Sequence, residues 1–161
     1  MEKKKLLLIQ PNYRSVYSYA GSSTATPIYP PLGLAYLAAV VREAGFPVKI
    51  IEANAHNLTH DQIKQEIAEY HPDFIAMSAS SSMMDEVDLL AKLCPDNVKI
   101  ILGGIHASVM YKQLLENFPI EAICIGEAEE SLIELLKALI EEKIKMLEKQ
   151  SILKKEESVS I

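Results

Sequence analysis

In the stretch Ile100-Ile101-Leu102-Gly103-Gly104-Ile105-His106-Ala107-Ser108, an apolar run ends in two glycines and a helical pattern begins almost at once. A buried strand, a glycine turn and a helix in this order are how α/β proteins bring bare backbone close to a ligand at the carboxyl end of a strand. We therefore expect a ligand at that edge, although a tight turn without a ligand would give the same pattern.

Four other apolar runs are as short and nearly continuous as the one before the glycines, which is typical of parallel strands buried on both faces. The predicted strands are residues 6–9, 48–51, 74–77, 98–102 and 122–125. Helical patterns lie between consecutive runs and after the last one. Five such units in series predict a three-layer α/β/α sandwich with a flavodoxin-like, five-stranded parallel sheet in the order 2-1-3-4-5.

Local signals mark several helix ends. Thr59 with Gln62 predicts a capping box, and Ser82 with Asp85 predicts a weaker one. Gly45 follows the first helical pattern, as a glycine that ends a helix would.

Composition limits the class of protein. The chain has 161 residues, 49% of them hydrophobic, which suits one globular domain. A net charge of -6 without Trp or clustered Arg argues against a nucleic-acid surface. Cys94 and Cys124 lie far apart and outside any C-x-x-C unit, so we expect buried thiols in a reducing compartment. The apolar stretch after the basic N-terminus is too short for a signal peptide or a membrane span, so a cytoplasmic protein is expected.

Two segments depart from the strand and helix rhythm. The connection over residues 11–31 is long for a strand-to-helix loop, and it is expected to be a lid, a docking surface or a surface loop. We expect residues 1–140 to form the domain and residues 141–161 to form a helical extension or a frayed tail.

In the predicted strand order, the loops after strands one, three, four and five gather at one edge. The run Ser78-Ala79-Ser80-Ser81-Ser82 follows the third strand, and its hydroxyls can bind a ligand or cap a helix. The fifth strand leads into Gly126-Glu127-Ala128-Glu129-Glu130, whose carboxylates are expected in the first turn of a helix, where helix capping alone could explain them.

The histidines divide into two groups. His106 follows the two glycines, so it is expected either to face the ligand or to have a capping or packing role. His56 and His60 have the spacing of metal ligands on a helix, but they flank Thr59 and are expected to straddle a loop and a helix start on the surface.

Familiar phosphate-binding motifs are missing. No G-x-G-x-x-G or Walker loop follows a predicted strand, and Gln10-Pro11-Asn12 replaces the acidic residues of a phosphoacceptor receiver. A flavodoxin-like domain that binds a nucleotide or flavin stays as the alternative. The small polar run at 21–26 resembles a flavodoxin phosphate loop in composition, although it comes later in the chain than that loop would. A structural remnant without a ligand is the third reading.

Four motifs occur in one fixed order: the segment from Pro30-Pro31-Leu32-Gly33 to Gly45, the exit Glu52-Ala53-Asn54, the turn Gly103-Gly104-Ile105-His106-Ala107, and Gly126-Glu127-Ala128-Glu129-Glu130. Together they resemble the N-terminal cobalamin-binding domain of cobalamin-dependent radical S-adenosylmethionine (SAM) enzymes. That class includes anaerobic magnesium-protoporphyrin IX monomethyl ester cyclases and several methyltransferases. The resemblance covers nearly residues 5–140.

The resemblance implies a corrinoid over the carboxyl edge of the sheet, with its nucleotide tail in the crevice below. Gly103 and Gly104 would let the tail pass close to the backbone, and Asn12 and Tyr13 would lie near the corrin face. The expected cofactor contacts are Asn12, Tyr13, Asn54, Ser78, Ala79, Ser80, Ser81, Gly103, Gly104, His106, Gly126 and Glu127. Gly104→Val is expected to abolish binding and leave the fold intact.

Two departures qualify the implied function. The D-x-H-x-x-G motif of methionine-synthase-type corrinoid proteins is absent, because Pro11-Asn12-Tyr13-Arg14-Ser15 follows the first strand. We therefore expect cobalamin that is base-off or without a protein His ligand, and we assign no metal ligand to this chain. The C-x-x-x-C-x-x-C loop is also absent, so no iron-sulfur cluster is expected here, and a radical SAM partner chain or domain would supply catalysis.

Overall fold

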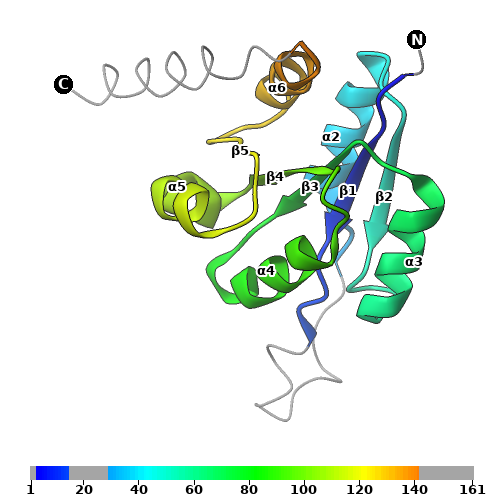
Figure 1. Cartoon of the computed structure of the whole chain (residues 1–161), viewed down its shortest axis with the longest axis vertical. Helices are drawn as coiled ribbons and strands as arrows, with labels where there is room; N and C mark the ends of the chain where they lie inside the picture. The colour runs from blue at the N-terminus through cyan, green and yellow to red at the C-terminus, as the bar shows by residue number, and fades with distance from the viewer. Residues whose placement is uncertain (1–2, 15–28, 142–161) are drawn as a thin grey trace.

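The computed structural model describes residues 3–14 and 29–141. Its sheet is parallel throughout and has the predicted order β2-β1-β3-β4-β5 (Figure 1). The strands are β1 (Leu6–Gln10), β2 (Val48–Glu52), β3 (Phe74–Ser78), β4 (Lys99–Gly103) and β5 (Ala122–Ile123).

Helices cover both faces of the sheet, as predicted for a three-layer sandwich (Figure 1). Side chains of α2 and α6 pack on one face, and those of α3, α4 and α5 pack on the other. The helices are α2 (Leu32–Glu43), α3 (His60–Tyr70), α4 (Met84–Leu93), α5 (Ile105–Asn117) and α6 (Ser131–Ile140), and the 3-10 turn η1 (Ser81–Met83) precedes α4.

Strand β1 shows why its run is almost wholly apolar. Leu7 and Ile9 point into the core under α3, α4 and α5, whereas Leu6 and Leu8 point into the core under α2 and α6. All four side chains are 0% exposed. A strand buried on both faces cannot alternate apolar with polar residues, which confirms the reading of these runs as central parallel strands.

Some local predictions are confirmed and some are wrong. The capping box at Thr59 forms in full, and Gly45 follows α2 with a φ of 90°. The capping box at Ser82 does not form, because η1 occupies that position and the Ser82 hydroxyl lies 3.3 Å from that of Ser80 instead. Strand β5 ends two residues earlier than predicted, since the chain turns away toward Gly126, where φ is 77°.

The expected lid or docking loop falls largely on residues 15–28, and the expected tail falls on residues 142–161. Both lie outside the described residues. Among the helices of residues 3–14 and 29–141, none has the length and apolar character needed to cross a bilayer.

Candidate ligand-binding site

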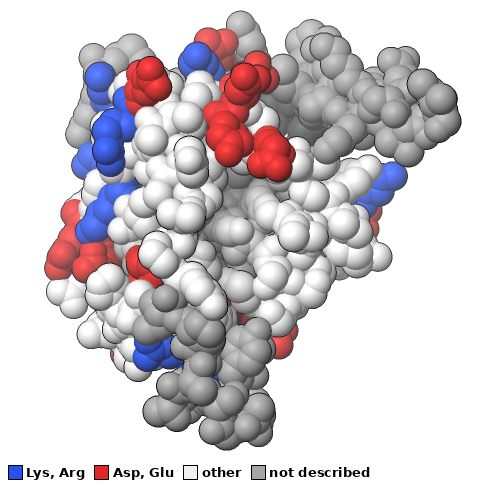
Figure 2. Space-filling view, turned by 180° about the vertical axis from the view of Figure 1, so that it is seen from behind, with Lys and Arg blue, Asp and Glu red and all other residues white. Residues whose placement is uncertain are grey.

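A cavity of about 260 Å³ opens at the carboxyl edge of the sheet, between the central strands and helices α2 and α6. In Figure 2 the surface on this side is hollowed beside a group of acidic side chains. Sites for drug-sized molecules usually measure about 300–1,000 Å³. The cavity therefore suits one flat group of a large ligand better than the whole of it.

The floor and the mouth of the cavity differ in chemistry. Buried apolar side chains form the floor, and the more exposed polar residues lie at the mouth. The floor includes Leu8, Leu34, Ala76, Ile101, Cys124 and Leu132, each no more than 7% exposed. The mouth includes Gln10, Gly33, Ser78, Gly126, Glu127 and Glu129. Such a site takes an apolar group inward and leaves polar groups in contact with water.

The turn after β4 is held tightly against the exit of β3. Gly104 has φ 95° and ψ 178°, and a Cβ there would lie 2.9 Å from the Ala79 carbonyl oxygen and 3.0 Å from the Ser78 hydroxyl. Gly104→Val is therefore expected to destabilise the fold as well as to affect binding, because a side chain would meet backbone. At Gly103, which lines the cavity, a Cβ would come no closer than 3.9 Å to Cys124.

The serine run contributes one residue to the cavity, Ser78. Ala79 is 2% exposed and packs in the core, and Ser80 contacts Ser82. The Ser81 hydroxyl lies 2.9 Å from Nδ1 of His106, so these two side chains orient each other at the same edge outside the cavity lining. The contacts of Ser80, Ser81 and His106 with a cofactor stay predictions.

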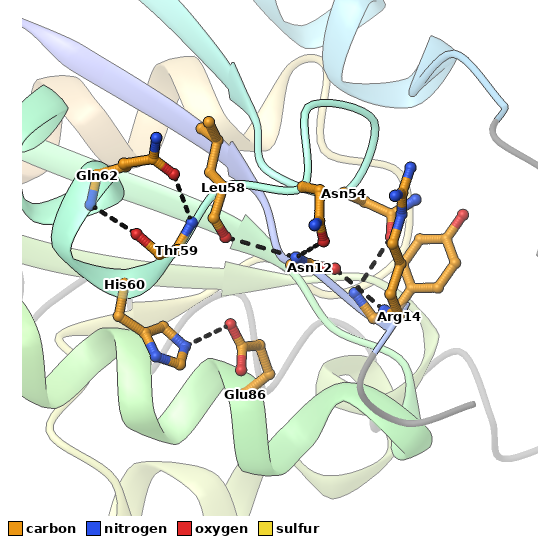
Figure 3. A network of polar contacts seen from close by, with 10 residues as sticks. Asn12, Arg14, Asn54, Leu58, Thr59, His60, Gln62 and Glu86 are labelled. Atoms are coloured by element: carbon orange, nitrogen blue, oxygen red, sulfur yellow. Dashed lines mark hydrogen bonds and ion pairs between the residues drawn. The ribbon is translucent and has the colours of Figure 1, made fainter. Parts of the chain in front are cut away.

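Asn12, Tyr13 and Asn54 lie outside the cavity lining and form a polar network between two loops (Figure 3). Asn54 is 1% exposed, and its Oδ1 accepts a hydrogen bond from the Tyr13 N–H at 3.4 Å. Asn12 Nδ2 donates to Asn57 Oδ1 at 3.2 Å and to the Leu58 carbonyl at 3.4 Å. The structure thus gives these residues a role in joining the loop after β1 to the loop after β2. Their contact with a cofactor stays a prediction.

The sequence predicted that the carboxylates after β5 lie in the first turn of a helix, and the structure shows that this is wrong for Glu127 and Glu129. Helix α6 begins only at Ser131, so Glu127 and Glu129 lie in the preceding loop and reach the mouth of the cavity. Ser108 holds this loop in place, because its hydroxyl donates to the Gly104 carbonyl at 2.9 Å and accepts from the Gly126 N–H at 3.0 Å.

Several lining residues were not predicted. Ser108, which holds the loop after β5 without lining the cavity, was not predicted either, although a serine four residues after Gly104 can bond back to the Gly104 carbonyl. The floor residues carry no sequence signal that marks them as lining residues, because a side chain that lines an apolar cavity and one that packs in the core are both apolar. The Pro-Pro-Leu-Gly segment starts α2 as expected, and it also contributes Pro31 and Gly33 to the lining.

The two cysteines are protonated at neutral pH. Burial raises the pKa of the Cys124 thiol to about 11, against a smaller lowering by Ser131, and burial raises the pKa of Cys94 to about 11 as well. Cys124 lines the cavity, whereas Cys94 packs on the opposite face of the sheet and donates to the Leu90 carbonyl. Cys124 is buried among apolar side chains, so it forms part of the apolar wall of the cavity.

The histidine pair on the surface behaves as expected. His60 starts α3 and its Nε2 lies 2.9 Å from the Glu86 carboxylate, while Nδ1 of His56 contacts the Glu52 carbonyl. Across the described ranges, no group of three or more His, Cys, Asp or Glu side chains could hold a metal ion.

Comparison with known proteins places this geometry in context. The sequence model for the B12 binding domain matches residues 21–136. The chain is 35% identical over 143 residues to an uncharacterized methyltransferase of Pyrococcus horikoshii, which covers 86% of this chain and 30% of the relative. It is 32% identical over 139 residues to the anaerobic magnesium-protoporphyrin IX monomethyl ester cyclase of Cereibacter sphaeroides, which covers 83% of this chain and 22% of the relative. The chain thus spans less than a third of the length of these relatives.

A solved structure shares the fold. The radical SAM methyltransferase TsrM from Kitasatospora setae, with cobalamin and a [4Fe-4S] cluster bound, superposes with a TM-score of 0.68 at 22% identity. The match covers 87% of this chain and 25% of that chain.

Proposed function

We propose a function from one premise: this chain belongs to the family of B12-binding domains. On that premise it is a cobalamin-binding module, and it holds the corrinoid at the carboxyl edge of its sheet. The nucleotide tail enters the cavity between the sheet, α2 and α6. The corrin ring stays outside, over the loops that follow the strands.

The observation that carries this proposal is the match between the cavity and one part of cobalamin. The floor is apolar and buried, the volume of about 260 Å³ suits a single ring system, and the opening lies at the ligand edge of a doubly wound sheet. A Cβ at Gly33 would meet no atom within 4 Å, so open space adjoins α2 at the mouth. The residues present therefore fit the group that the family binds.

The rim residues are placed to bind the polar parts of the corrinoid. The carboxylates of Glu127 and Glu129 can accept hydrogen bonds from the amide side chains of the corrin, and the Ser78 hydroxyl can donate or accept. Bound cobalamin supplies the cobalt chemistry, and the protein supplies binding, orientation and exclusion of water.

The state of cobalt follows from where the base lies. A base held in the cavity is removed from cobalt, and the loop after β1 carries Asn12 and Tyr13 where other corrinoid proteins have their His motif. We therefore propose base-off cobalamin without a His ligand from that loop. The polar network of Asn12 and Asn54 supports this for the described start of the loop, because the Asn12 amide is bonded to Asn57 and to the Leu58 carbonyl and the Tyr13 N–H is bonded to Asn54.

Catalysis needs a partner. The C-x-x-x-C-x-x-C loop does not occur in the sequence, and the relatives are more than three times as long as the matched region. We propose that a radical SAM catalytic domain or chain works with this module in a methyltransferase or cyclase type of system. TsrM, which contains both parts, supports this arrangement.

Binding of hydroxocobalamin tests the proposal. After mixing and gel filtration, the protein is expected to retain a cobalamin spectrum in its base-off form. Gly33→Leu should weaken retention by filling the open mouth, whereas Ala39→Leu, on the exposed side of the same helix, should not. Loss of cobalamin from the unmodified protein would refute the proposal, and retention of FMN instead would support the flavodoxin-like alternative.

A further inference from the structure

We infer that the cavity selects the lower base of the corrinoid and takes a benzimidazole in preference to an adenine. The inference rests on the proposed function, since it assumes that the nucleotide tail enters the cavity. It goes further by naming the chemical class of cobamide that the module accepts.

The side chains of the floor offer almost no hydrogen-bonding groups to a ligand. Its side chains come from Leu8, Leu34, Ala76, Ile101, Cys124 and Leu132. The strand residues among them lie within paired parallel strands, where Leu8 is opposite Ala76 and Ala76 is opposite Ile101. Their peptide groups therefore serve the sheet. The one polar atom in this set, the Cys124 sulfur, is a weak hydrogen-bonding group that already interacts with Ser131.

The two kinds of base make different demands on such a floor. Adenine carries an exocyclic amine and ring nitrogens, and each of these loses its hydrogen bonds to water when it is buried without a partner. Dimethylbenzimidazole has two methyl groups instead of the amine, and burial of methyl groups is favourable. The cavity should therefore reject the purine and accept the benzimidazole.

The polar residues of the cavity are in the wrong place to help adenine. Gln10, Ser78, Glu127 and Glu129 lie at the mouth and are more exposed than the floor. A base that reaches the floor passes beyond them, and they face the sugar and the corrin amides instead. Selection thus arises from the depth at which polar and apolar residues lie.

Three probes test the inference by equilibrium dialysis: hydroxocobalamin, its adenine counterpart, and cobinamide, which has no nucleotide. We expect hydroxocobalamin to bind at least about tenfold more tightly than the adenine counterpart, with cobinamide weakest. The base must leave cobalt before it can enter the cavity, and adenine coordinates cobalt more weakly than benzimidazole does. Without selection by the cavity, the adenine form would therefore bind more tightly, which is the opposite of the order that we expect.

The outcomes separate the two proposals. Equal or tighter binding of the adenine form overturns the inference while the proposed function stands. Cobinamide that binds as tightly as cobalamin also overturns it, because the base would then lie outside the cavity. If none of the three corrinoids binds, the proposed function fails and the inference fails with it.

The two cysteines provide a matched pair of variants. Cys124→Ser places a stronger hydrogen-bonding group in the floor and should narrow the preference several-fold, whereas Cys94→Ser on the opposite face should leave it unchanged. If Cys124→Ser does not fold, Ala76→Ser makes the same test at another floor position. An unchanged preference in the folded floor variant would place the base elsewhere and overturn the inference.

Discussion

Two adjacent glycines are expected to have opposite roles, and alanine substitutions separate them. Gly104 adopts φ 95° and ψ 178°, a region of backbone conformation that is nearly exclusive to glycine. A Cβ there would also lie 2.9 Å from the Ala79 carbonyl oxygen and 3.2 Å from the Ala79 nitrogen. Because both atoms belong to the backbone, no side-chain rotation relieves the contact.

The cost of Gly104→Ala follows from these two effects. Backbone strain of this kind costs about 1–3 kcal/mol, and overpacking costs a similar amount, so we expect the free energy of unfolding to fall by roughly 2–6 kcal/mol. For a chain of this size, at about 2–4 °C per kcal/mol, that lowers Tm by at least about 4 °C. In Gly103→Ala the new Cβ comes no closer than 3.9 Å to Cys124, so its stability should stay within about 0.5 kcal/mol of the parent.

Thermal and urea denaturation followed by circular dichroism measure both effects, and cobalamin titration completes the comparison. Gly103→Ala should melt like the parent but bind cobalamin less well, because Gly103 lines the cavity. Gly104→Ala should melt earlier even without a ligand. If Gly104→Ala melts with the parent, the close approach to Ala79 is not the reason for this glycine, and our account of the turn is refuted.

Three further predictions follow from single groups. Alkylation of Cys124 should accelerate as the pH rises toward its pKa of about 11. Cobalamin should protect this thiol but not Cys94, and mass spectrometry of the labelled peptides measures both. Equal protection of the two thiols would contradict our location of the site. Burial opposes ionisation of Asp73, but hydrogen bonds from Lys4 and from the Lys5 N–H outweigh it and lower its pKa, so Asp73→Asn should cost about 0.5–1 kcal/mol at neutral pH. The difference in free energy of unfolding between the parent and Asp73→Asn should vanish as the pH falls through the lowered pKa of Asp73. Urea titrations at several pH values measure it, and a difference that does not change with pH would show that the carboxylate is not responsible. Asn54→Ala should lower the free energy of unfolding by about 1–3 kcal/mol, since the Tyr13 N–H loses its acceptor, and parent-like chemical denaturation would contradict this.

The fold could be predicted because its signals are local. Short apolar runs separated by helical patterns indicate parallel strands with crossover helices, and the handedness of these connections leaves few strand orders. The capping box at Thr59 was equally local, since the two side chains involved are three residues apart. The prediction at Ser82 was wrong because a 3-10 turn competed for the same residues.

The candidate site could be predicted only in part. The strand ends were identified, and Ser78, Gly103, Gly104, Gly126 and Glu127 do line the cavity. Residues whose side chains are used within the fold were harder to judge. The sequence does not distinguish a buried Asn54, or a Ser81 that is hydrogen-bonded to His106, from residues that bind a ligand.

Strands, helices and the family resemblance could be read from the sequence alone, because each depends on patterns within a few residues, and the handedness of the connections then limited the strand order. Which apolar side chains leave space between them became clear only once the helices were packed on the sheet. Leu8, Ile101 and Leu132 come from distant parts of the chain, and the gap they surround exists only after α2 and α6 pack on the sheet. The same packing brings Gly104 against Ala79, so both glycines of the turn line the cavity but only Gly104 is also required by the fold.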